Sequence, residues 1–77
     1  MPRVGDRIAD PSSTPIGRVD AVFADYVLVR TRGLPPVDLY VPRPELSPRD
    51  DGGFRVEADP RQAYERWHRP LRKSPHP

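Results

Sequence analysis

The side chains with the clearest chemical potential in this sequence are the basic ones near its C-terminus. The last twelve residues hold four cationic side chains and no acidic one, namely Arg66, Arg69, Arg72 and Lys73. Residues 1–65 carry nine arginines against eleven acids, so the excess positive charge is confined to that end. Such a cluster could contact the phosphates of a nucleic acid, with an affinity that falls steeply as salt rises. The charge pattern by itself favours a solvated tail.

Three aromatic side chains are candidates for contacts with a partner. Tyr64 and Trp67 lie among the basic residues and could stack on bases, but aromatic residues on a short helix more often anchor it to a core or an interface. Tyr40 lies between two apolar residues of a β-type segment, so its ring is expected on the outer side of a strand. We predict these three residues as partner-binding, and the four basic residues as the alternative, nucleic-acid-binding set.

Few other residues have the type and spacing that catalysis or metal binding requires. His68 and His76 have no third ligand at a short, fixed spacing. Asp50 and Asp51 precede two glycines and are better explained as turn residues than as an acid–base pair. The chain has no Cys, which excludes a thiolate nucleophile and a disulfide framework. We predict no catalytic residue, metal, cofactor or small-molecule substrate, although an enzyme whose site forms between subunits stays open.

The elements that position these side chains must be small. The chain has 77 residues, of which 12 are Pro, so it has room for one domain and cannot be mostly helical. A domain of this size buries only about 60% of the surface that its unfolded chain exposes, which leaves little space for a deep, dry pocket. No segment has the apolar length of a signal peptide or a membrane span. These features favour a cytoplasmic binding module without a membrane partner.

Short alternating segments predict a mainly β architecture. Strands are expected at residues 4–8, 16–23, 26–31 and 37–41, with a short edge segment at 45–49 and a closing strand from Phe54. Gly17 is expected to mark a bulge or a close backbone approach. The two glycines after Asp51 supply the positive φ angles that a final hairpin turn needs. The prolines fall in loops, at strand edges or at helix ends, so they separate the elements without interrupting them.

Residues 59–62, with the sequence Asp-Pro-Arg-Gln, predict the start of a helix. They combine an N-cap acid, a Pro at the first helical position and a Gln that completes a capping box. Pro70 limits the helix to two or three turns. Because so short a helix is unstable alone, Tyr64 and Trp67 are expected to dock it against the sheet. The prediction is one domain over residues 1–69, a closed antiparallel, SH3-like barrel of five or six short strands with a C-terminal helix, and a basic Pro-containing tail over 70–77.

The order of these features resembles the PRC-barrel superfamily, particularly its small bacterial members of unknown function. The matching segments are GDRIAD at 5–10, IGRVDAV at 16–22, DYVLV at 25–29, LYVP at 39–42 and the late Trp67. In this superfamily the barrel occurs in a ribosome-maturation factor and on the cytoplasmic part of a photosynthetic reaction-centre subunit. The resemblance therefore implies a PRC-barrel-like fold and an adapter role, and it supplies no active site. The Pro-rich turn at 11–15 is longer than the usual pattern.

These observations predict a non-enzymatic adapter. It would bind another protein, or a second copy of itself, through an outer barrel face and the helix that carries Tyr64 and Trp67. The alternative is an RNA- or ribosome-associated factor that uses the basic C-terminal segment.

Overall fold

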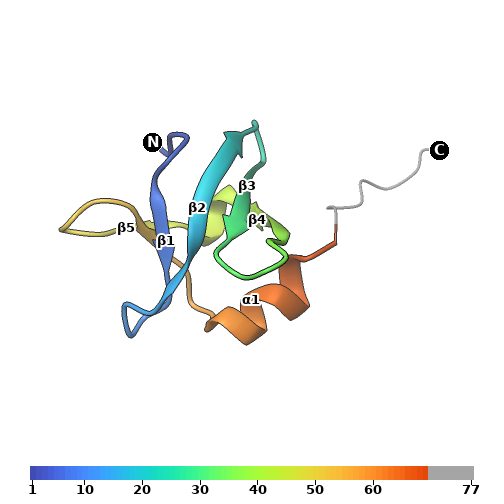
Figure 1. Ribbon diagram of the computed structural model, residues 1–77. Helices are drawn as coiled ribbons and strands as arrows, with labels where there is room; N and C mark the ends of the chain where they lie inside the picture. Colours follow the sequence, from blue (N-terminus) through green and yellow to red (C-terminus); the bar gives the residue numbers. More distant parts are fainter. Residues whose placement is uncertain (70–77) are drawn as a thin grey trace.

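A computed structural model of the chain describes residues 1–69, which form one curled β-sheet and one short helix (Figure 1). The elements are β1 (Arg7–Ala9), β2 (Pro15–Val22), β3 (Tyr26–Thr31), β4 (Asp38–Pro42), a 3₁₀ turn (Arg43–Glu45), β5 (Ser47–Pro48), β6 (Phe54–Arg55) and α1 (Pro60–Trp67). The predicted mainly β class with a C-terminal helix is confirmed. The predicted tail, with Arg72, Lys73 and His76, lies outside the described residues. No helix within residues 1–69 is long and apolar enough to cross a membrane.

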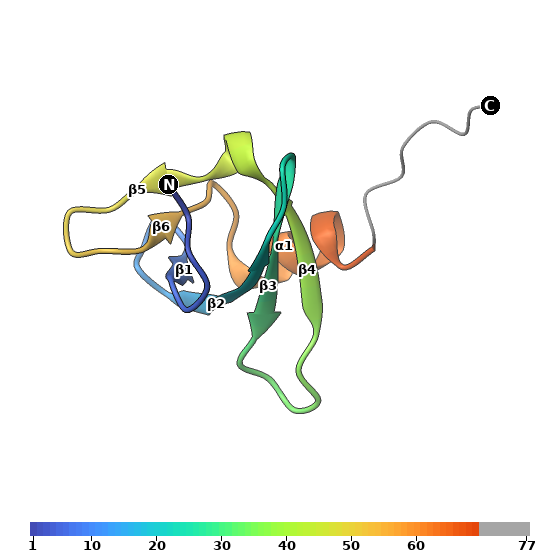
Figure 2. The ribbon, with the colours of Figure 1, turned by 90° about the horizontal axis from the view of Figure 1, so that it is seen from above.

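The sheet has the strand order β4-β3-β2-β1-β6-β5. Four of its neighbouring pairs are antiparallel, but β1 and β6 run parallel, with Ile8 opposite Phe54. The all-antiparallel prediction is therefore wrong at this pair. The predicted closure is also wrong, because no pairing among the described strands joins β4 to β5. Strand β5 has only two residues, and one of them, Pro48, has no N–H to donate, so β5 can form few hydrogen bonds to a further strand. The sheet therefore curls into a half-barrel with two open edges (Figure 2).

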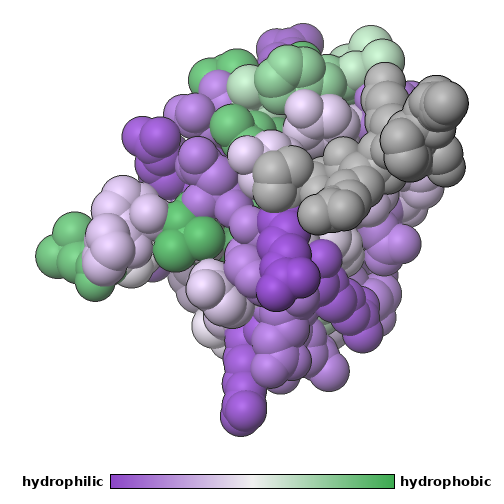
Figure 3. Space-filling view, turned by 90° about the vertical axis from the view of Figure 1, so that its right-hand side faces the viewer, coloured by the Kyte–Doolittle hydropathy of each residue, from purple (hydrophilic) through white to green (hydrophobic). Residues whose placement is uncertain are grey.

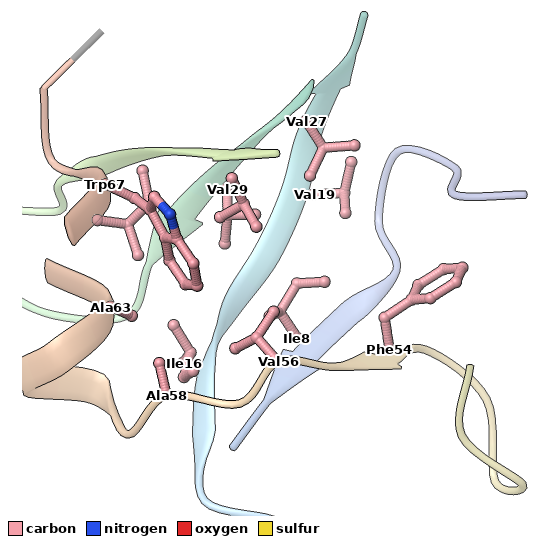
Figure 4. Packing of buried hydrophobic residues seen from close by; sticks show 12 residues of the cluster. Ile8, Ile16, Val19, Val27, Val29, Phe54, Val56, Ala58, Ala63 and Trp67 are labelled. Carbon is pink, nitrogen blue, oxygen red and sulfur yellow. The ribbon is translucent and has the colours of Figure 1, made fainter. Parts of the chain in front are cut away.

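The core lies between the concave side of this sheet and the helix. Alternating residues of the central strands, such as Val27 and Val29 of β3, point inward and are fully buried. Figure 4 shows Ala63 and Trp67 pointing from α1 into the same cluster. The buried apolar cluster consists of Ile8, Ile16, Val19, Val27, Val29, Leu39, Val41, Phe54, Val56, Ala58, Ala63 and Trp67.

The helix begins as the sequence predicts. The Asp59 carboxylate accepts the Gln62 N–H at 2.8 Å, and the Gln62 side-chain oxygen accepts the Asp59 N–H at 3.0 Å, which completes the capping box. Trp67 docks the helix, but the prediction that Tyr64 does so is wrong, because Tyr64 is 46% exposed. Ala63 and Trp67 are four residues apart, or about 40° around the helix, and together define its buried face, whereas Tyr64 lies about 100° from Ala63.

The first strand is shorter than predicted. Val4 and Gly5 form a turn instead, in which Gly5 has a φ of 95° and its N–H donates to the Val19 carbonyl at 2.8 Å. The close backbone approach predicted at Gly17 is confirmed, since a Cβ there would overlap the Arg30 carbonyl. The predicted bulge is also present, because the β1–β2 register shifts between Ile8 and Ala9 and leaves Ile16, next to Gly17, without a partner in β1. A second register shift in β2, toward β3, lies between Val19 and Ala21.

The Pro-rich turn between β1 and β2 is organised by one buried acid. Asp10 is only 7% exposed. Its carboxylate accepts the N–H groups of Ser12 at 2.9 Å and Thr14 at 2.7 Å. In this Asx-type turn the backbone N–H groups of Ser12 and Thr14 are hydrogen-bonded, so the chain reverses from β1 into β2 without leaving them unpaired.

Candidate functional site

The outer face of β2, β3 and β4 carries an apolar cluster. We call it the aromatic patch, and it consists of Ala21, Phe23, Tyr26, Leu28 and Tyr40. The register places Leu28 opposite both Ala21 and Tyr40, because the bulge in β2 shifts Ala21 onto this face. The Phe23 and Tyr26 rings stack with centroids 4.7 Å apart, and the Tyr26 and Tyr40 centroids are 5.9 Å apart. Phe23 is 44% exposed, and Tyr26, Leu28 and Tyr40 are half-buried.

Exposed hydrophobic surface occurs at the β2–β3 turn and also at Leu34 in the β3–β4 loop, which is 97% exposed. Figure 3 shows hydrophobic residues at the upper end, where β2 turns into β3, and on a projection at the left, while hydrophilic residues cover much of the lower end, where the helix lies. Val22, next to Phe23 in this turn, is 37% exposed. The aromatic patch therefore continues into exposed apolar surface at the β2–β3 turn.

The structure does not bring the three predicted partner-binding residues onto one surface. Tyr40 lies on the outer face of β4, because its neighbours Leu39 and Val41 point into the core. Trp67 lies on the inner side of the sheet, is only 6% exposed and packs the helix against the core. Tyr64 is exposed on the helix and stacks on His68, with centroids 4.4 Å apart. Of the three, Tyr40 belongs to a larger apolar surface.

The predicted nucleic-acid-binding set is only partly described. The Arg66 guanidinium lies 6.0 Å from the Trp67 ring centroid and donates to the Glu57 carbonyl at 3.5 Å. Its contacts are thus with the fold itself. Arg69 is exposed at the end of the helix. Arg72 and Lys73 are outside the described residues.

A second surface, which we call the arginine groove, lies at the opposite end of β2. Its floor is formed by β1 and by the first half of β2, and the loop at 49–53 between β5 and β6 forms one side. Figures 1 and 2 show this hairpin projecting from the sheet beside β1. The charged residues that line the groove are Asp6, Arg7, Arg18, Arg32, Arg49 and Asp51.

Two of the residues considered for catalysis or metal binding, Asp51 and His68, have structural partners. Asp51 is ion-paired with Arg49, with Nε and Oδ1 3.2 Å apart, in the turn that the sequence predicts. His68 Nδ1 lies 2.6 Å from the Tyr64 carbonyl oxygen, on the helix. Within residues 1–69, no group of three or more His, Cys, Asp or Glu side chains is placed to hold a metal ion.

Sequence reasoning missed Phe23 and Tyr26 as surface residues, and it missed the arginine groove. The alternation of Tyr26, Leu28 and Arg30 against the buried valines of β3 was visible in the sequence. The register between strands was not visible, and only the register shows which outer residues are neighbours.

No protein-family model matches the chain, and no curated protein matches it either. The resemblance to the PRC-barrel superfamily therefore rests on the five sequence segments and stays a prediction.

Proposed function

We propose that the chain is a non-enzymatic, cytoplasmic interaction module with a PRC-barrel-like fold, and that it pairs with a second copy of itself through the aromatic patch. The observation that carries this proposal is the stacked cluster of Phe23, Tyr26 and Tyr40 on the convex side of the sheet, where it contributes nothing to the core. Aromatic rings are enriched in protein interfaces, because they bury a large apolar area for few rotatable bonds.

The shape of this face favours a second copy as the occupant. Leu28 and Tyr40 are at its centre, the Phe23–Tyr26 stack lies toward the β2–β3 turn, and Arg30 lies toward the other end of β3. A two-fold axis through the centre would set Arg30 of each copy against the aromatic stack of the other. Arg over an aromatic face is attractive by about 0.5–2 kcal/mol, depending on desolvation. The face is therefore complementary to itself in the antiparallel orientation.

The likeness to PRC-barrel domains is supported by where the matching segments lie. Residues 16–22 fall on β2, 25–29 cover most of β3, and 39–42 lie on β4, so three of the five segments form the continuous part of the half-barrel. Trp67 holds the helix against it. This arrangement suits an adapter, because a small half-barrel presents broad outer surfaces and little enclosed space.

Sedimentation velocity over a wide protein concentration range tests self-association. The wild-type chain is expected to shift from monomer to dimer as its concentration rises. Phe23→Ser should weaken the dimer about tenfold or more, the loss typical of truncating an aromatic interface residue. Tyr64→Ser is the matched control, because Tyr64 is 46% exposed and stacked, as Phe23 is 44% exposed and stacked. A wild-type chain that stays monomeric throughout, or equal weakening by both substitutions, would overturn the proposal.

The alternative of an RNA- or ribosome-associated factor that uses the basic C-terminal segment has less support, because Arg66 is engaged with Trp67 and Glu57. Its remaining residues stay a prediction from sequence. The arginine groove is a separate basic surface, and it leads to a different inference.

A further inference from the structure

Three arginines stand opposite one another on adjacent strands of the outer face. Arg7 of β1 is paired in register with Arg18 of β2, and Arg18 is paired with Arg30 of β3. Side chains that are directly opposite in antiparallel strands have Cβ atoms about 5 Å apart, and like charges in such positions are destabilising. The sheet therefore holds a row of repelling charges that its own packing does not require.

Only one end of this row is neutralised by the protein. Arg30 is ion-paired with Asp38, with Nε and Oδ1 3.4 Å apart. Within residues 1–69, no carboxylate oxygen lies within 4.0 Å of the side-chain nitrogens of Arg7 or Arg18. Both residues are exposed and line the groove, where an anion could approach both.

The groove adds further positive charge around this pair. Arg32 reaches it from the loop after β3, and Arg49 from the β5–β6 hairpin, so four arginines line it against two aspartates. Both aspartates are engaged. The Asp51 carboxylate contacts Arg49, and the Asp6 carboxylate accepts the Arg3 N–H at 2.9 Å. The net field of the groove is therefore positive.

Few side chains cover the floor of the groove. Four of the five glycines in the chain line it, namely Gly5, Gly17, Gly52 and Gly53. A ligand can approach the backbone at Gly5 and Gly52, where the space of a Cβ is open, whereas the Cβ positions of Gly17 and Gly53 face the carbonyls of Arg30 and Arg7. The four arginines come from four separate segments of the chain, which suits an extended anion with several charged groups better than a compact one.

The lining of the groove argues against a peptide as its ligand. An extended peptide would need a free strand edge or apolar pockets for its side chains. Strand β1 is paired on both sides, by β2 and β6, and so offers no edge. The apolar floor residues Ile8 and Ala9 are only 1% and 3% exposed, so they form no pocket. The groove instead presents guanidinium groups, whose planar arrangement of N–H donors matches the oxygens of a phosphate.

We propose that the arginine groove binds the phosphodiester backbone of a single-stranded nucleic acid, with Arg7 and Arg18 as its central contacts. Recognition would be through phosphates and largely independent of sequence. The groove is at the other end of β2 from the Phe23–Tyr26 stack. Arg18 is opposite Arg30, which the proposed dimer sets against the stack of the second copy, so the groove and the dimer surface adjoin on the outer face of the sheet.

Fluorescence anisotropy with the full chain tests the proposal, using labelled oligouridine and oligothymidine of equal length. Three to four phosphate contacts predict a slope of log K against log salt of about −2 to −3. Arg18→Gln should reduce the magnitude of this slope by about 0.7 and weaken binding about fivefold at 0.1 M salt. Arg61→Gln is the matched control, because Arg61 is an exposed arginine on the far helix. Comparing the two polymers shows whether RNA or DNA is preferred.

Two further arms establish whether the groove is the binding site and whether its ligand is a nucleic acid. The double variant Arg72→Gln with Lys73→Gln removes charge from the basic segment, and it should leave most of the affinity intact. Loss of binding in that variant, with Arg18→Gln unchanged, would overturn the groove as the site. Equal binding of polyglutamate would overturn the choice of nucleic acid. Phe23→Ser should bind nucleic acid as the wild type does, so failure of self-association and failure of this inference are distinguishable.

Discussion

Arg18→Gln should stabilise the free protein, although it removes a native side chain from the centre of the sheet. Arg18 is opposite Arg7 on one side and Arg30 on the other, so the substitution removes two like-charge pairs. Each such pair is worth about 0.2–1 kcal/mol. The pair with Arg30 counts for less, because Asp38 lies 3.4 Å from the Arg30 guanidinium. The expected gain in the free energy of unfolding is therefore about 1 kcal/mol, or roughly 4–8 °C in Tm for a domain of this size.

Thermal unfolding followed by circular dichroism at low and high salt measures this effect. The Debye length falls from about 10 Å at 0.1 M to about 3 Å at 1 M salt, so the gain should shrink at high salt. Arg55→Gln is the matched control, since Arg55 is an exposed strand arginine that is paired with Glu57 at 3.0 Å. Removal of the Arg55 guanidinium should leave the free energy of unfolding unchanged or lower it by less than about 1 kcal/mol. A less stable Arg18→Gln protein, or a gain that does not depend on salt, would refute the like-charge reasoning.

Two further substitutions test the parts of the fold that support these surfaces. Trp67→Ala should cost about 3–5 kcal/mol in urea unfolding, a large part of the roughly 4–12 kcal/mol expected for a chain of this length, whereas Tyr64→Ala should cost less than about 1 kcal/mol. Equal costs would contradict the assignment of the helix's buried face. Asp10→Ala should lower stability by about 1–3 kcal/mol, because two N–H groups lose their acceptor. Asp10→Asn, which keeps a side-chain oxygen, should recover most of that loss in a thermal melt.

Local signals in the sequence identified most of the elements. The capping box of Asp59 and Gln62 involves only four consecutive residues, and the alternation of β3 involves only six. Neither signal depends on the rest of the chain. The glycines of the final hairpin also adopt positive φ angles, 96° at Gly52 and 74° at Gly53, as such a turn requires.

Features that depend on distant parts of the chain were not predictable in the same way. The parallel pair between Ile8 and Phe54 joins residues that are 46 positions apart, and no turn sequence specifies it. The row of arginines exists only because two separate registers align Arg7, Arg18 and Arg30. Tyr64 was misplaced because aromatic character alone does not decide between neighbouring helical positions, and the small side chain of Ala63 fits the close contact with the sheet.

The central claim is that interactions are made by the outer face of the sheet and not by the C-terminal helix. Backbone amide chemical shifts in ¹⁵N–¹H correlation spectra test it directly, first on dilution of the protein and then on addition of oligouridine. We expect dilution to shift the amides of residues 21–30 and 38–41, and the oligonucleotide to shift the amides around Arg7, Arg18 and Gly52. Shifts that are confined to residues 60–69 in both experiments would contradict the claim.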